Sequence, residues 1–432
     1  MNLTPNLSSS TDPLPNDSGG RHTDMPELRL FVMALFFIFG GITSLNDVII
    51  PKLKELFALN YMQAMLVQSA FFAAYFAISI PGAWLVKRVG YMRGAAIGLL
   101  TMMAGCLLFI PASASATFVV FLLALFVLAS GVTIVQVVAN PLISLLGPVR
   151  SAHSRLTFAQ AFNSLGTTLF PYFGSIIILG SLATINAADL SGAALDAYRV
   201  EETRVVVRAY FGLAVALLII AGAVWFNRNR LKGERHESGS LLQSFSLLKQ
   251  SRFALGAMCI FLYVGAEVAI GSLIVNYLKQ ADVLALSDQA AGKLIPLYWG
   301  GALLGRFIGS AIMRKVSPGK VLAFNAIGAI AMILLSANSS GAMAGYSLLA
   351  IGLMNSIMFP TIFALACEGL GARAADGSGV ICMAIVGGAI IPPLTGQLAD
   401  MSGSLAIALT LPALCYVLIA LFGIYARKPV TV

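Results

Sequence analysis

Two acidic side chains stand inside long apolar runs of this sequence, where a charge is costly. Asp47 lies in SLNDVIIP and Glu267 in YVGAEVAI. Removing a carboxylate from water disfavours its charged form, so such a group takes up and releases a proton as its surroundings change. We therefore predict Asp47 and Glu267 as proton-coupling residues. The alternatives are an ion pair with Arg306, which also lies in an apolar run, or a charge near a helix end. The role of Arg306 stays open between a link to another helix, snorkelling and ligand contact.

Amide side chains recur in the same kind of run. Members of each close pair, three or four residues apart, share one face of a helix. An amide both donates and accepts hydrogen bonds, as a sugar hydroxyl does, and aromatic rings can stack on the apolar face of a sugar. For any single amide, a hydrogen bond between helices is the simpler explanation. As a group, these residues predict a site for a small polyhydroxylated ligand: Asn46, Gln136, Asn140, Gln160, Asn163, Tyr263, Trp299 and Asn355.

The elements that carry these residues must lie in a membrane. Of 432 residues, 59% are hydrophobic and 10% are charged, whereas soluble domains carry about 25% charged residues. So few charges cannot cover a soluble protein of this size. The net charge of +9 is spread over short loops rather than gathered on one face. This pattern predicts a lipid bilayer as partner and argues against nucleic acid.

The motifs of enzymes and metal sites are missing from the sequence. The five cysteines lie in or at the ends of apolar runs without CxxC spacing, and the three histidines fall in the tail or in loops. There is no Walker A loop, dinucleotide fingerprint, nucleophile elbow or HExxH. We predict no enzyme activity, no metal and no cofactor. The coupling ion is expected to be a proton, with sodium as the alternative.

Twelve apolar runs are long enough to cross a bilayer, which takes about 20 residues of helix. They predict an all-α membrane protein with twelve transmembrane helices in two six-helix bundles: 28–50, 62–86, 94–112, 117–146, 156–180, 205–226, 253–278, 289–313, 320–337, 342–367, 377–399 and 403–426. The expected organisation is a disordered tail (1–27), a first bundle (28–226), a linker (227–252), a second bundle (253–426) and a short tail (427–432).

The basic residues predict the orientation of these spans. When both termini are placed on one side, most of the 27 Lys and Arg residues fall on that side. Short cytoplasmic loops are enriched in Lys and Arg, so both termini are expected to be cytoplasmic. The predicted location is a bacterial-type cytoplasmic (inner) membrane, and the expected assembly is a monomer.

The two halves of the chain repeat one another. The basic group after the second span returns after the eighth with the same internal spacing, as Lys87, Arg88 and Arg93 against Arg314, Lys315 and Lys320. Gly166 and Pro171 of the fifth span correspond to Gly387 and Pro392 of the eleventh. In transporters built from such repeats, the substrate lies between the halves at mid-depth.

Several strings resemble the fucose permease family of the major facilitator superfamily: SLNDVIIPKL, QSAFFAAYF, VVANPLISLLGP, RLTFAQAFNSLGT and FPTIFALACEGLG. The resemblance runs through nearly all twelve spans. It implies alternating access by a rocker-switch and a sugar in the central cavity, of the fucose, galactose, glucose, mannose or N-acetylglucosamine class, often carried with protons. By motif, the family's first-span acid falls on Asp47 and its fifth-span amides fall on Gln160 and Asn163.

Two positions depart from the family pattern. Gln136 stands where fucose permease has a glutamate, and a neutral amide binds a hydroxyl but cannot titrate; this counts against fucose as the substrate. Lys87 replaces the superfamily's acid after the second span, so the contacts at the inner side are expected to differ. The sequence predicts a monosaccharide importer by proton symport. The alternatives are a sodium-coupled or passive sugar carrier, a drug efflux carrier of the same superfamily, and a membrane sensor that transports nothing.

Overall fold

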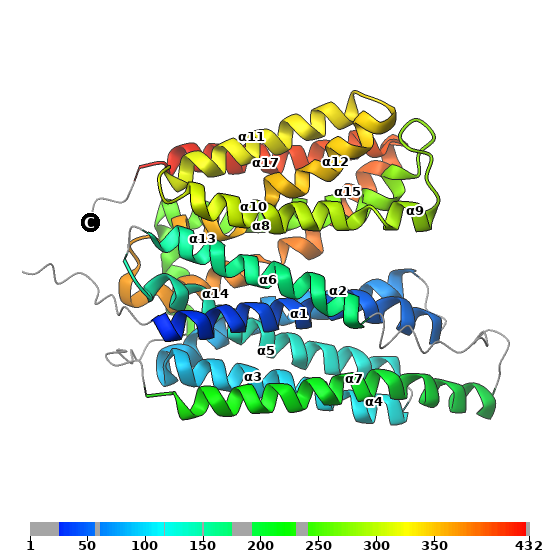
Figure 1. Ribbon diagram of the computed structural model, residues 1–432, viewed down its shortest axis with the longest axis vertical. Coiled ribbons are helices and arrows are strands. Elements are labelled where there is room, and N and C mark those ends of the chain that lie inside the picture. The colour runs from blue at the N-terminus through cyan, green and yellow to red at the C-terminus, as the bar shows by residue number, and fades with distance from the viewer. Residues whose placement is uncertain are drawn as a thin grey trace, which may run out of the picture.

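The computed structural model describes residues 26–56, 61–115, 117–148, 151–174, 192–229 and 241–428. Every regular element in these ranges is a helix, and the long helices lie side by side along one direction of the molecule (Figure 1). The first half of the chain supplies α1 (Pro26–Leu56), α2 (Tyr61–Val89), α3 (Tyr91–Leu107), α4 (Phe109–Ser115), α5 (Phe118–Leu145), α6 (Ala152–Gly174) and α7 (Ala193–Phe226).

The second half opens with a short 3₁₀ helix, η4 (Leu241–Lys249), inside the segment predicted as a linker. It continues with α8 (Ser251–Leu278), α9 (Asp288–Gly292), α10 (Ile295–Ile312), α11 (Pro318–Ala337), α12 (Gly341–Asn355), α13 (Met358–Ala366), η5 (Gly371–Arg373), α14 (Ala374–Ala384), α15 (Gly387–Ser402), α16 (Leu405–Ala408) and α17 (Thr410–Tyr425). Within the described residues, each predicted span coincides with one helix or with two consecutive helices, which confirms the all-helical fold. Residues 175–180 of the fifth predicted span lie outside the described residues.

Within the described ranges, ten helical segments are long and apolar enough to cross a membrane. Two more helices, α6 and α10, complete the twelve transmembrane helices that the sequence predicts, but they are too polar to meet the same criterion. The polar residues that lower their hydropathy include Gln160 and Asn163 on α6 and Arg306 on α10. Both helices thus carry candidate site residues, as α5 and α8 also do.

Proline explains three of the interruptions within spans. A proline inside a helix lacks the N–H that would bind the carbonyl four residues earlier, and its ring crowds that carbonyl. Four residues before Pro111, Pro360 and Pro412 stand Leu107, Ser356 and Ala408, and α3, α12 and α16 end at or beside these positions. The break at Ser356 matters most, because it leaves a backbone carbonyl free next to the candidate site.

The internal repeat appears in the packing. A Cβ atom on Gly166 of α6 would lie 2.1 Å from the carbonyl oxygen of Phe37 on α1. A Cβ atom on Gly387 of α15 would lie 1.9 Å from the carbonyl oxygen of Phe261 on α8. Both distances are far shorter than any carbon–oxygen contact allows. The two matched glycines thus let equivalent helix pairs pack closely in the two halves.

The two halves meet along a limited set of helices. α2 packs against α14, α6 against α10 and α13, and α5 against α14. In Figure 1 the helices of the first half lie below and most of those of the second half lie above, with α6, α13 and α14 near the boundary. The candidate site lies at the boundary between the halves.

Helix α7 begins twelve residues before the predicted span because its charged first turns extend past the apolar stretch.

Candidate functional site

A cavity of about 170 Å³ lies between the two halves. Four helices of the first half and three of the second contribute to its wall, together with Ile385 between α14 and α15. The lining residues are Phe39, Gly40, Thr43, Tyr75, Gln136, Gln160, Asn163, Thr167, Val264, Glu267, Arg306, Phe359 and Ile385. Four of the residues singled out by the sequence, Gln136, Gln160, Asn163 and Glu267, meet at this one place.

The wall formed by the first half is rich in amides. On α5, Gln136 is buried, and its Oε1 accepts a hydrogen bond of 2.7 Å from the Tyr75 hydroxyl on α2. On α6, the Gln160 Nε2 lies 3.5 Å from Oδ1 of Asn140, which is fully buried behind the cavity. Asn163 donates to the carbonyl of Phe36 on α1 at 3.3 Å. These contacts fix the amides and leave donor and acceptor positions for a ligand.

The wall formed by the second half carries the acid. Tyr263 lies one turn before Glu267 on α8, and its hydroxyl lies 2.7 Å from the Glu267 Oε1 and 3.1 Å from the carbonyl oxygen of Asn355. The Asn355 side chain donates to the Tyr298 hydroxyl at 2.9 Å and accepts from the Tyr416 hydroxyl at 2.7 Å. Asn355 and the three tyrosines are buried. They form a network behind Glu267 that orients its carboxyl group.

Arg306 connects the two walls. Its guanidinium is held by Nε donating to the Ser356 carbonyl at 3.0 Å, the carbonyl that the helix break leaves free. Across the boundary, its NH1 donates to the Gln160 carbonyl at 2.9 Å and to the Ser164 hydroxyl, both on α6. Arg306 and Glu267 line the same cavity. A positive charge from the second half is thus tied to the amide-bearing helix of the first.

Three other predicted site residues lie elsewhere or cannot be placed. Trp299 follows the fully buried Tyr298 on α10, but its own side chain is 43% exposed and does not line the cavity. Consecutive residues of a helix point about 100° apart, which accounts for the difference. Asn46 and Asp47 belong to α1, but their side chains lie outside the described residues. For both, the assignment to the site stays a prediction.

A second set of polar contacts joins the halves at the end where α2 terminates and α14 begins. Lys87 of α2 and Asp376 of α14 form an ion pair with Nζ–O distances of 3.2 and 3.1 Å, and their side chains are 6% and 2% exposed. Asp376 also accepts from the Ser244 hydroxyl of η4 at 2.7 Å and lies 3.5 Å from the Arg373 Nε. The lysine that departs from the superfamily pattern therefore has a buried acidic partner, which sequence reasoning did not identify.

On the same side, a pair of serines joins α6 to α10. The Ser154 hydroxyl donates to the Ser310 carbonyl at 2.8 Å, and the Ser310 hydroxyl lies 3.0 Å from the Ser154 carbonyl. Together with the ion pair, these bonds hold the halves together between the cavity and this end of the molecule.

Residues 32–393 match the sequence profile of the Major Facilitator Superfamily. The chain belongs to the Major Facilitator Superfamily. This superfamily consists of transporters rather than enzymes, and its twelve-helix fold accounts for the twelve predicted transmembrane segments. Over 396 residues, the chain is 47% identical to a glucose/galactose transporter of Brucella abortus, covering 91% of this chain and 92% of the relative. It is 32% identical over 406 residues to the L-fucose-proton symporter of Escherichia coli, covering 92% of each.

Solved structures show the same superfamily fold. The crystal structure of FucP in the outward conformation superimposes with a TM-score of 0.85 at 30% sequence identity, over 93% of this chain and 99% of that one. The expected membership of the fucose permease-like group of the superfamily is confirmed by these relatives.

Proposed function

We propose that this protein carries a monosaccharide across the membrane together with a proton. The observation that carries the proposal is the composition of the central cavity, where amides of one half face a carboxyl group and a guanidinium of the other. Amides suit sugar hydroxyls, which donate and accept at once. A carboxyl group in a cavity that opens to alternate sides can take a proton on one side and release it on the other.

The preferred substrate class is a hexose of the glucose or galactose type. The relative named as a glucose/galactose transporter is 47% identical, against 32% for the one named as an L-fucose-proton symporter. The neutral Gln136, paired with the Tyr75 hydroxyl at 2.7 Å, supports the same choice, because it offers a hydroxyl contact without a charge.

Two acids share the coupling role in this proposal. Glu267 lines the cavity and is oriented by Tyr263. Asp47 lies one helical turn after Thr43, which lines the cavity from α1. Gln136, Gln160 and Asn163 bind hydroxyls, and Asn140, Tyr263 and Asn355 support the lining residues from behind. Asn46 stays a predicted member of the site, as does Trp299, which does not line this cavity.

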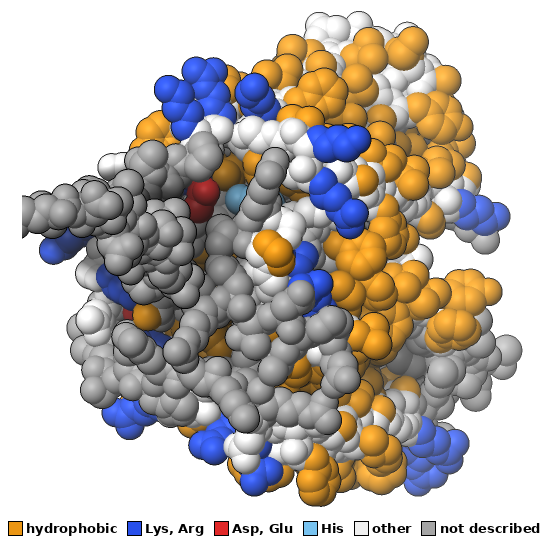
Figure 2. Space-filling model, turned by 60° about the vertical axis from the view of Figure 1, so that its left-hand side comes forward, with side chains coloured by type: hydrophobic (Ala, Val, Ile, Leu, Met, Phe, Trp, Pro, Cys, Tyr) orange, Lys and Arg blue, Asp and Glu red, His pale blue; other side chains and the backbone are white. Residues whose placement is uncertain are grey.

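In this proposal the chain is organised as a tail (1–27), two six-helix bundles (28–226 and 253–426), a linker (227–252) and a short tail (427–432). Both termini lie in the cytoplasm of a bacterial-type cell, the membrane is the inner one, and the carrier works as a monomer. Figure 2 looks toward the end where α2 terminates and α14 begins: Lys and Arg side chains stand around it, and the flank beside it is mostly hydrophobic. Basic residues at one end support this orientation.

The test is uptake of labelled glucose, galactose and fucose into vesicles that contain the purified protein, with and without an inward proton gradient. Accumulation of glucose or galactose that requires the gradient is expected. Glu267→Gln and Asp47→Asn should abolish accumulation but retain exchange of labelled for unlabelled sugar. Asp400→Asn, at an exposed acid outside the cavity, is the matched control and should behave as the unchanged protein.

Other outcomes select the alternatives. Accumulation driven by a sodium gradient at equal pH would replace the proton by sodium. Equilibration without accumulation under any gradient would identify a passive carrier. If none of the sugars enters the vesicles, the proposal is refuted.

A further inference from the structure

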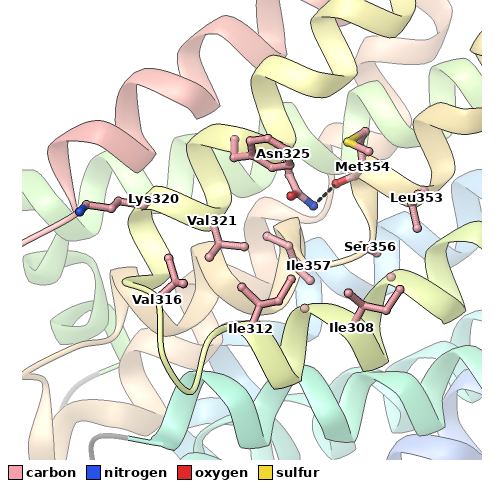
Figure 3. A pocket seen from close by; sticks show the side chains of 13 residues that line it. Ile308, Ile312, Val316, Lys320, Val321, Asn325, Leu353, Met354, Ser356 and Ile357 are labelled. Carbon is pink, nitrogen blue, oxygen red and sulfur yellow. Dashed lines mark hydrogen bonds between the residues drawn. The ribbon is translucent and has the colours of Figure 1, made fainter.

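A larger cavity lies away from the central one, between α10 and α11. Its volume is about 480 Å³, within the range of ~300–1,000 Å³ usual for sites that bind small molecules. Its walls are largely apolar and come from α10, α11 and the break between α12 and α13. Figure 3 shows Ile308, Ile312, Val316, Val321, Leu353 and Ile357 around it.

The groove is open toward the bilayer. Ile308 and Ile312 are 48% and 43% exposed on the molecular surface, and Phe324 on the opposite wall is 71% exposed. In a membrane-spanning protein, exposed apolar side chains of this kind contact lipid. The surrounding bilayer can therefore supply an occupant directly to this groove.

Helix packing explains why the space exists. A Cβ atom on Gly305 or Gly309 of α10 would lie 2.3 Å from the Ser356 Oγ or 2.1 Å from the Ile357 Cγ2. These glycines bring α10 close to the break between α12 and α13. α11 packs instead against α12, α13 and α17. α10 and α11 thus both pack against α12, and a groove remains between α10 and α11.

One end of the groove is basic. Lys320 lines the groove, and its side chain lies at the end nearest the turn between α10 and α11 (Figure 3). Arg314 and Lys315 are exposed in that turn, and the segment from Met313 to Lys320 contains no acid. α11 begins there, so the partial positive charge of its N-terminus has the same sign.

We propose that this groove binds one acyl chain of an anionic phospholipid, whose phosphate lies at Lys320, Arg314 and Lys315. An apolar channel with a basic end complements an amphiphile with an acidic head. The amide of Asn325, one of few polar groups in the wall, already donates to the Met354 carbonyl at 2.9 Å. Few polar groups therefore remain for a sugar, and a neutral apolar ligand would leave the basic end unused.

The groove touches the central site at Ser356. Ser356 lines the groove, and its carbonyl accepts the hydrogen bond of Arg306 in the central cavity. A bound acyl chain supports the helix break that holds Arg306. The lipid is therefore expected to increase the rate of transport. This consequence rests on the proposed transport function, whereas the binding of the lipid does not depend on that function.

The test uses the purified full-length protein in mild detergent and native mass spectrometry with two lipids of identical chains, palmitoyl-oleoyl phosphatidylglycerol and phosphatidylcholine. Phosphatidylglycerol is expected to bind more tightly. Lys320→Gln should weaken its binding about five-fold, which corresponds to ~1 kcal/mol for one basic side chain at an anionic lipid surface. Lys320→Arg should retain binding, and Ile312→Trp, which fills the groove, should weaken it.

Arg93→Gln is the matched control, because Arg93 is exposed at the corresponding position of the first half and carries the same charge. It should leave binding unchanged. Equal binding of the two lipids would overturn the proposal. So would equal losses in Arg93→Gln and Lys320→Gln, which would indicate general surface attraction. Competition by glycerol phosphate at concentrations similar to those of the lipid would also overturn it, since a site for the headgroup alone needs no groove.

Discussion

Breaking the ion pair between Lys87 and Asp376 is expected to open the end of the molecule that this pair joins. Both side chains are almost fully buried, and the two Nζ–O distances are close to 3 Å. Removing one partner of a buried pair costs ~3–5 kcal/mol because the other charge stays buried. Asp376 keeps its hydrogen bond from Ser244 and its ion pair with Arg373, so the lower figure of ~3 kcal/mol applies.

This cost falls on the closed arrangement alone. When α2 and α14 separate, the remaining carboxylate reaches water and the penalty disappears. At ~1.4 kcal/mol for each factor of ten, Lys87→Met should shift the equilibrium toward the open arrangement about 100-fold. Replacing both partners by apolar residues, as in Lys87→Met/Asp376→Leu, removes the unpaired charge and should return most of the population to the closed arrangement.

Spin labels on the two halves measure this shift. Arg93 and Lys315 are exposed at this end, one in each half, and both can be changed to cysteine after the five native cysteines are replaced. Double electron–electron resonance should show a longer distance between the labels in Lys87→Met than in the labelled protein that retains Lys87 and Asp376. The reasoning is refuted if Lys87→Met leaves the distances unchanged, or if the double variant is as open as the single one.

Three further variants follow from the packing and the site. Gly387→Val should lower the melting temperature in detergent by several degrees, because a Cβ atom there meets the Phe261 carbonyl at 1.9 Å. Gly396→Ala should leave the melting temperature unchanged, because a Cβ atom there meets nothing within 4 Å. Equal melting temperatures of the two variants would contradict the close approach of α8 and α15. Arg306→Lys should reduce sugar exchange at least about ten-fold, because an ammonium cannot reach all the acceptors that the guanidinium binds on α6 and at the helix break. Unchanged exchange would contradict the role of Arg306 in linking the two halves. Asn355→Leu should lower the melting temperature by leaving two buried tyrosine hydroxyls without their amide partner, at ~1–3 kcal/mol each, and an unaltered thermal transition would show that they find other partners.

The fold could be predicted from the sequence because the bilayer imposes a strong constraint. A span must be apolar for about 20 residues, and twelve such runs are visible in the sequence. The repeat of Gly166 and Gly387 pointed to equivalent positions in the two halves, and both glycines occupy equivalent helix contacts. The helix interruptions before Pro111, Pro360 and Pro412 were not predicted, and proline alone does not predict them, because Pro81 and Pro141 stand inside unbroken helices.

The site could be predicted in part. Gln136, Gln160, Asn163 and Glu267 stood out because a polar group within an apolar run is expensive, and all four line one cavity. Trp299 shows the limit of this reasoning: α10 carries apolar residues on all sides, so the sequence does not reveal that Tyr298 is fully buried while Trp299 is 43% exposed. The partners Tyr75, for Gln136, and Asp376, for Lys87, lie 61 and 289 residues away in the chain. No local pattern specifies such pairs.

The role of Arg306, which the sequence left open, follows from a defect in the backbone. An arginine inside a bilayer needs acceptors for its guanidinium, and most carbonyls of an intact helix already accept a backbone hydrogen bond, although a carbonyl can accept a second one, as that of Gln160 on α6 does. Pro360 removes one such bond and frees the carbonyl of Ser356, to which Arg306 donates. The same break forms part of the wall of the groove between α10 and α11. Replacing Pro360 by alanine would restore that helical bond, so Arg306 would lose an acceptor without any change in its own neighbours' side chains. The charge that spans the two halves depends on a proline more than fifty residues away.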